Sequence, residues 1–160
     1  MPDWTASVID AISARLEPQV NWRTRLSECV ERGGHVHLGV FVEPFLRFVL
    51  DGTKKVESRF SVTRQAPYGK VGPGDVLLVK RASGPVVAVA EISEVWYYEL
   101  DRDAWAMIRS KFDRFLRIDD PQFWERKSGS CYATLMRLEH VEGIAPFECG
   151  KRDRRGWVVF

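Results

Sequence analysis

The stretch Gly52-Thr53-Lys54-Lys55-Val56-Glu57-Ser58-Arg59 brings charged groups into a segment that otherwise has the pattern of a core strand. Side chains of a strand alternate between its two faces. If residues 56–61 are extended, Glu57 and Arg59 therefore share one face. Gly52 suits the left-handed cap that ends a helix. This arrangement places Lys54 or Lys55 at the mouth of whatever the strand lines.

The segments around this stretch alternate between extended and helical patterns. Strands are predicted at residues 35–42, 56–61, 75–81, 86–97, 131–138 and 157–160, and helices at 44–50 and from 101 to 116, followed by a helical turn with Phe123 and Trp124. A break at residues 144–146 is expected to separate the last two strands. Residues 62–74 are rich in glycine and proline, which predicts a long mobile loop.

The spacing G-x-K-x-x-E-x-R after a short helix resembles the signature of the ASCH domain, a small module of the PUA-like superfamily. The match rests on Gly52, Lys54, Glu57 and Arg59, and residues 72–78 resemble the "G-D-hydrophobic" strand start that the family has next. The resemblance covers about residues 35–160. It implies an α+β fold, a mostly antiparallel β-barrel of five or six strands with flanking helices.

Residues 1–34 precede this region and have a helical period over 3–16 and again over 21–30, closing at Gly33-Gly34. A minimal ASCH module does not require such a segment. We interpret residues 1–34 as an N-terminal helical extension that packs against the barrel domain, residues 35–160, or binds a protein partner.

Composition limits the class of protein. The chain has 160 residues and three cysteines without C-x-x-C pairing, which fits one domain in a reducing compartment. No apolar run approaches the roughly 20 residues that span a bilayer. We therefore expect a cytoplasmic protein with no membrane partner and no cofactor.

Positive charge gathers around the signature. Residues 52–81 hold seven Lys and Arg against two acidic residues, and the segment Lys151–Arg155 adds a net charge of three. The cations are Lys54, Lys55, Arg59, Arg64, Lys70, Lys80 and Arg81. If they meet on one face, they form a patch suited to phosphate groups. The alternative is a solvated basic surface without a ligand.

Lys54, Glu57 and Arg59 can form a polar pocket that recognises a base edge, in which Glu57 accepts from an exocyclic amine and Arg59 donates to a carbonyl or phosphate. The alternative is an internal ion pair of Glu57 with Arg59. Tyr68 lies between proline and glycine in the predicted loop and belongs to no apolar period, so it is a candidate lid or base-stacking residue.

Several other kinds of site find little support. The histidines and cysteines, among them His35 and His37, match no standard zinc spacing, so no metal is expected. No G-x-S-x-G motif and no phosphate-binding glycine loop is present. Serine hydrolase and nucleoside triphosphatase functions are therefore not indicated.

The resemblance implies a module that binds RNA, another nucleic acid or a modified base. An alternative follows from small ASCH proteins that are amidohydrolases of N4-acetylcytidine and use a lysine in this motif, a threonine three residues later and a glutamate. Lys54 matches that lysine, whereas Glu57 stands at the threonine position. As an enzyme, the chain would use Lys54 and Glu57 as catalytic groups. A third alternative is a protein-interaction module that uses the N-terminal helices.

Overall fold

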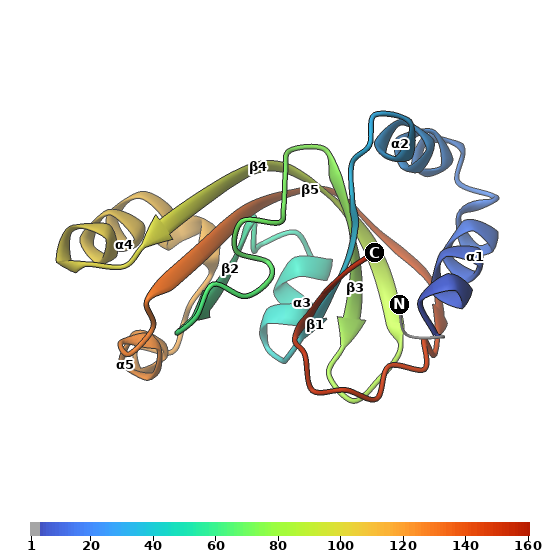
Figure 1. Ribbon diagram of the computed structural model, residues 1–160. Helices are drawn as coiled ribbons and strands as arrows, with labels where there is room; N and C mark the ends of the chain where they lie inside the picture. The colour runs from blue at the N-terminus through green and yellow to red at the C-terminus, as the bar shows by residue number, and fades with distance from the viewer. Residues whose placement is uncertain (1–3) are drawn as a thin grey trace.

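A computed structural model describes residues 4–160 and contains one curled six-stranded sheet (Figure 1). The strands are β1 (Val36–Phe41), β2 (Val56–Ser61), β3 (Asp75–Arg81), β4 (Val86–Glu99), β5 (Tyr132–Phe147) and β6 (Trp157–Val159). Their order across the sheet is β2-β5-β4-β3-β1-β6. Strands β1 and β3 are parallel, and the other neighbours are antiparallel. The predicted mixed, mostly antiparallel α+β architecture is confirmed.

The sheet curls without closing into a full barrel. Strands β2 and β6 are its two edges, and no pairing joins them within residues 4–160. The long strands β4 and β5 arch over the molecule side by side (Figure 1). The observed shape is therefore a half-barrel, with an opening between β2 on one side and β1 and β6 on the other.

Helices cover both ends of the arch. They are α1 (Trp4–Leu16), α2 (Val20–Glu31), α3 (Phe45–Leu50), α4 (Arg102–Leu116) and α5 (Gln122–Lys127). Helices α1 and α2 lie at one end of β4 and β5, α4 and α5 lie at the other, and α3 lies between them (Figure 1). Among residues 4–160, no helix combines the length and the apolar character that a membrane crossing requires.

Helices α1 and α2 share a hydrophobic core with the sheet. Their apolar side chains Val8, Ile12, Leu16, Trp22 and Cys29 are buried in one cluster with residues of β1, β3, β4 and β5. The indole Nε1 of Trp22 also donates to the His140 carbonyl of β5 at 3.1 Å. Of the two arrangements expected for residues 1–34, packing against the sheet is present for the described part.

Strand β5 is longer than the sequence suggests. The break predicted at residues 144–146 is wrong, because β5 continues to Phe147. Strand β2 pairs only with Tyr132–Arg137, so this later half of β5 has one neighbour, and Pro146 need not donate on its open side. On the other side, the pairing with β4 shifts register between Val86 and Ala88, where a bulge takes up the extra residues.

Helix α4 begins where expected and ends beside the signature. Asp101 caps it by accepting from the Ala104 N–H at 2.8 Å. Its apolar face buries Ile108, Phe112 and Leu116 against Val56 and Leu135. The last turn of a helix leaves carbonyls without intrahelical partners. Here the Leu116 carbonyl accepts from the Lys54 side chain and the Phe115 carbonyl accepts from the Lys55 N–H. These two bonds hold the end of α4 at the start of β2.

A buried network fixes the other side of the half-barrel. His37 on β1 is fully buried, its Nδ1 accepts from the Trp157 Nε1–H at 3.1 Å, and its Nε2 lies 2.9 Å from the Asp75 carboxylate. An indole nitrogen only donates, so the His37 proton sits on Nε2 and is donated to Asp75. Asp75 also accepts from the backbone N–H groups of His35 and Gly72. One carboxylate thus joins β1, β3, β6 and the loop before β3.

The Asp75→Asn variant is expected to lose about 2–4 kcal/mol of unfolding free energy, because an amide NH2 would face N–H donors.

Burial raises the pKa of Asp75, but the hydrogen bonds from His37, His35 and Gly72 outweigh it, so the pKa lies below its ordinary value. Such a carboxylate adds stability above its ordinary pKa and loses it as pH falls. Wild-type stability in urea should fall from about pH 5 to about pH 2, and less so in the variant. Exposed Asp113→Asn is the control, and an equal pH slope in Asp75→Asn and the wild type would contradict this assignment.

Candidate functional site

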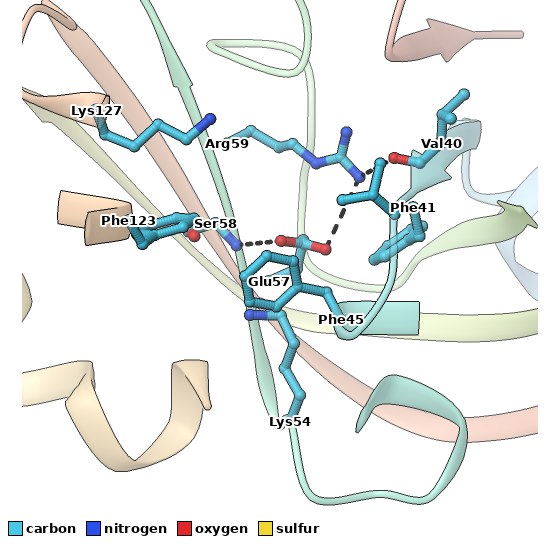
Figure 2. A pocket seen from close by; sticks show the side chains of 10 residues that line it. Val40, Phe41, Phe45, Lys54, Glu57, Ser58, Arg59, Phe123 and Lys127 are labelled. Carbon is cyan, nitrogen blue, oxygen red and sulfur yellow. Dashed lines mark hydrogen bonds and ion pairs between the residues drawn. The ribbon is translucent and has the colours of Figure 1, made fainter. Parts of the chain in front are cut away.

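A pocket of about 190 Å³ opens between β1, β2, α3 and α5. Lys54, Glu57, Ser58 and Arg59 come to it from the signature, Val40, Phe41, Val42 and Phe45 from the β1–α3 region, and Phe123 and Lys127 from α5. Figure 2 shows Glu57 between the Lys54 ammonium and the Arg59 guanidinium, with Phe123 beside Ser58. The expectation that Glu57 and Arg59 face one cleft agrees with this geometry.

Lys54 lies inside the pocket, not at its mouth. Its side chain is 2% exposed, and its ammonium donates to the Leu116 carbonyl at 2.5 Å, one of the last carbonyls of α4. The next N–H, that of Lys55, donates to the Phe115 carbonyl at 2.9 Å. The Lys54 ammonium and the Lys55 N–H therefore cap the C-terminal end of α4, where the helix dipole favours a cation.

Burial also changes the chemistry of Lys54. Loss of hydration lowers the pKa of the Lys54 amine, the Glu57 carboxylate opposes this, and the nearby Arg59 charge adds to the lowering. Within residues 4–160, no carboxylate oxygen lies within 4.0 Å of the Lys54 nitrogen. The expected rim position is therefore wrong, and Lys54 is a desolvated amine with access to the pocket.

The Glu57 carboxylate is held by one hydrogen bond, and its second oxygen accepts none within the described residues. One carboxylate oxygen accepts from the Ser58 N–H at 2.7 Å. The other lies 3.8 Å from Arg59 Nη2, beyond hydrogen-bond distance but within ion-pair range. The carboxylate therefore keeps acceptor positions for a ligand.

Arg59 spans the opening of the half-barrel. From β2 it donates through Nη2 to the Val40 carbonyl of β1 at 2.8 Å and through Nη1 to the Gly156 carbonyl before β6 at 3.2 Å. Its guanidinium lies over the rings of Phe41 and Trp157, at 4.9 and 5.2 Å from their centroids. Arg59 thus contacts both sides of the opening and lines the pocket.

A second hollow of about 210 Å³ adjoins the pocket and shares Ser58, Arg59 and Lys127 with it. Tyr68 lines this hollow and packs against Tyr97 and Tyr132, with ring centroids 5.3 and 4.9 Å away. Its loop is tied to β4 because the Tyr97 hydroxyl bonds both the N–H and the carbonyl of Val71. Tyr68 is therefore near the site as a wall of the second hollow.

The other predicted cations do not line the pocket. Lys80 is buried and donates to the Arg81 and Gly84 carbonyls of its own turn. Arg81 pairs with Glu43 at 2.9 Å, and Arg64 pairs with Glu99 at 2.7 Å. Lys70 and Lys55 are exposed outside the pocket. Three of these cations are therefore held by carbonyls or carboxylates, and a single basic face shared with the signature stays a prediction.

The segment Lys151–Arg155 does approach the site. Asp153 pairs with both Lys151 and Arg155, which folds the loop tightly, and leaves Arg152 and Arg154 exposed. The loop ends at Gly156, which lines the second hollow and accepts from Arg59. Arg152 and Arg154 are therefore exposed within four residues of a backbone group that lines the second hollow.

Sequence reasoning missed Phe45, Phe123 and Lys127. The two phenylalanines have the spacing of core residues, and their rings meet edge to face with centroids 5.7 Å apart. Lys127 comes about 70 residues after the signature and has no pattern that links it to Glu57. Among residues 4–160, no group of three or more His, Cys, Asp or Glu is arranged to hold a metal ion.

Comparison with known proteins identifies the fold. No protein-family profile and no curated protein sequence matches the chain. The structure of ASCH from Zymomonas mobilis superposes with a TM-score of 0.63 at 14% identity, covering 78% of this chain and 87% of that one. A point mutant of the same protein gives a TM-score of 0.61 at 12% identity, covering 78% and 89%. The chain therefore has the fold of these ASCH structures.

Arg59→Lys is expected to reduce the free energy of unfolding by about 2–3 kcal/mol, because an ammonium cannot bond Val40 and Gly156 together in the geometry of the guanidinium. Urea unfolding followed by tryptophan fluorescence measures the change. Arg152→Lys, on the exposed loop, should stay within about 0.5 kcal/mol of the wild type. Equal stability of the two variants would contradict the bridging role of Arg59.

Proposed function

We propose that the pocket beside Glu57 binds one nucleobase of RNA or of a modified nucleoside, so that the protein acts as a nucleic-acid-binding module. The observation that carries this proposal is the combination of a partly occupied carboxylate, two aromatic walls and cations in one pocket. The ASCH fold agrees with it, because PUA-like barrels often bind RNA.

The pocket chemistry suits a base. The free acceptor positions of Glu57 match an exocyclic amine, and Arg59 can donate to a ring carbonyl. Phe45 and Phe123 offer apolar ring surface against which a base can pack. A volume of about 190 Å³ is below the roughly 300–1,000 Å³ of pockets for drug-sized ligands. A single base therefore fits better than a larger ligand.

Glu57→Gln is expected to weaken binding of the preferred nucleoside about tenfold, because it exchanges carboxylate acceptors for an amide of the same shape. Isothermal titration with cytidine, uridine, adenosine, guanosine and N4-acetylcytidine measures the affinity. Glu99→Gln is the matched control, since Glu99 is exposed and pairs with Arg64 outside the pocket. Equal affinities of the wild type and Glu57→Gln would reject the role of Glu57.

RNA binding should also depend on salt, since phosphate contacts release counterions. A single-stranded RNA of roughly ten nucleotides should lose affinity steadily as salt is added. Affinity that is absent at low salt, or insensitive to it, would refute the nucleic-acid function and favour a small molecule or a protein partner at the N-terminal helices.

Hydrolysis of an acylated nucleoside is the second candidate, and the buried Lys54 amine favours it. A lowered pKa makes the neutral form of the Lys54 amine available at lower pH than usual, and the neutral amine can take a proton from water. The water oxygen would add to the acetyl carbon of N4-acetylcytidine, the C–N bond would break, and the departing amine would receive the proton held by Lys54, directly or relayed through Glu57. Glu57 occupies the position where the hydrolases have threonine, which weighs against this candidate.

Incubation with N4-acetylcytidine tests the hydrolase directly. If cytidine is released, Lys54→Met should abolish turnover, and the wild-type rate should rise with pH as the neutral amine becomes populated. Methionine keeps the shape of lysine and removes a desolvated charge, so the variant should remain folded. Lys55→Met controls for loss of a neighbouring charge outside the pocket. Full turnover in Lys54→Met, or no cytidine release by the wild type, would exclude this mechanism.

A further inference from the structure

The pocket and the second hollow meet at two cationic side chains, Arg59 and Lys127. We propose that these side chains form a phosphate subsite that joins the two hollows, so that the ligand is a nucleotide or an oligonucleotide and not a free nucleoside. The identity of the ligand as a nucleotide rests on the proposed base pocket. The anion site itself rests on the two cations.

Arg59 has donors left for an anion. A guanidinium carries five N–H groups. Hydrogen bonds to Val40 and Gly156 use two of them, and Glu57 lies at 3.8 Å. The bonds to Val40 and Gly156 fix the plane of the group, and its side chain is 21% exposed. A fixed, partly exposed guanidinium suits recognition of a phosphate, because little freedom is lost on binding.

Lys127 supplies the second positive charge. It lies in the last turn of α5, with its ammonium 5.5 Å from the centroid of the Phe123 ring, and it lines both hollows. Within residues 4–160, no carboxylate lies within ion-pair distance of its nitrogen. In Figure 2 its side chain extends towards Arg59 across the top of the pocket. The dipole of α5 favours a cation in this turn. The Arg59 guanidinium itself is turned towards Val40 and Glu57 (Figure 2).

The charge balance of the site favours an anion. Lys54, Arg59 and Lys127 carry three positive charges against the one carboxylate of Glu57. The balance stays positive even when the Lys54 amine is neutral. Arg59 and Lys127 both line the two hollows, and a phosphate bound where the hollows meet would offset the repulsion between these two charges. The exposed Arg152 and Arg154 add to the positive potential on the β6 side.

The lining of the second hollow suits the sugar-phosphate chain. Ser61, Gln65 and Thr134 bring hydroxyl and amide groups to it, and Tyr68 and Phe60 form its aromatic walls. Such groups can bond ribose hydroxyls and phosphate oxygens. A base in the first pocket and a phosphate at Arg59 and Lys127 would direct the neighbouring nucleotide into this hollow.

Titration of matched ligands tests the subsite. For the base that binds best, the nucleoside, its 5′- and 3′-monophosphates and a dinucleoside monophosphate are compared. A phosphate should raise affinity about tenfold, and Lys127→Ala should bring the ratio of nucleotide to nucleoside affinity close to one. Lys111→Ala, a lysine over an aromatic ring on α4, should keep the gain. A gain only with the dinucleotide assigns a phosphodiester, and a gain with a monophosphate assigns a phosphate monoester.

A second readout separates the subsite from the proposed function. Inorganic phosphate at millimolar concentration should shift the Arg59 Nε–H NMR signal in the wild type, and the shift should be lost in Lys127→Ala. A shift without any nucleoside binding would support the anion site and refute the base pocket. Equal affinities for nucleoside and nucleotide, or no phosphate-dependent shift, would overturn the subsite while leaving the base pocket intact.

Discussion

The architecture depends on how Arg59 bridges the opening of the half-barrel. Its guanidinium joins β2 to the backbone of β1 and of the segment before β6, which lie 19 and 97 residues away in the sequence. Within the described residues, no ladder of backbone hydrogen bonds joins β2 to β1 or to β6. The same side chain forms a wall of both hollows. Arg59 therefore both bridges the opening of the half-barrel and shapes the candidate site, so a substitution there is expected to affect both.

Lys54 has a similar double role. It satisfies a carbonyl at the end of α4, and this contact removes its amine from water. A buried cation is costly unless it is bonded. The helix end supplies the bond that makes burial tolerable, and burial in turn lowers the pKa of the amine. The capping of α4 and the lowered pKa of Lys54 are thus consequences of the same placement.

Local rules in the sequence predict much of this site and miss its remote parts. Strand alternation correctly puts Glu57 and Arg59 on one face, and Gly52 has the expected left-handed conformation with φ +79°. The burial of Lys54 depends on where α4 ends, about 60 residues later, so no local pattern reveals it. The same holds for Phe123 and Lys127 on α5. Lys80 belongs to a basic run in the sequence, yet it folds back onto its own turn.

The opening of the half-barrel also bears on self-association. Exposed sheet edges can pair with another chain and start aggregation. Here one edge strand, β6, spans three residues, and the other, β2, spans six. Arg59 extends from β2 across the opening and places a charged group where an added strand would have to enter. An incomplete barrel can therefore keep a ligand entrance without offering its edges as a template for polymerisation.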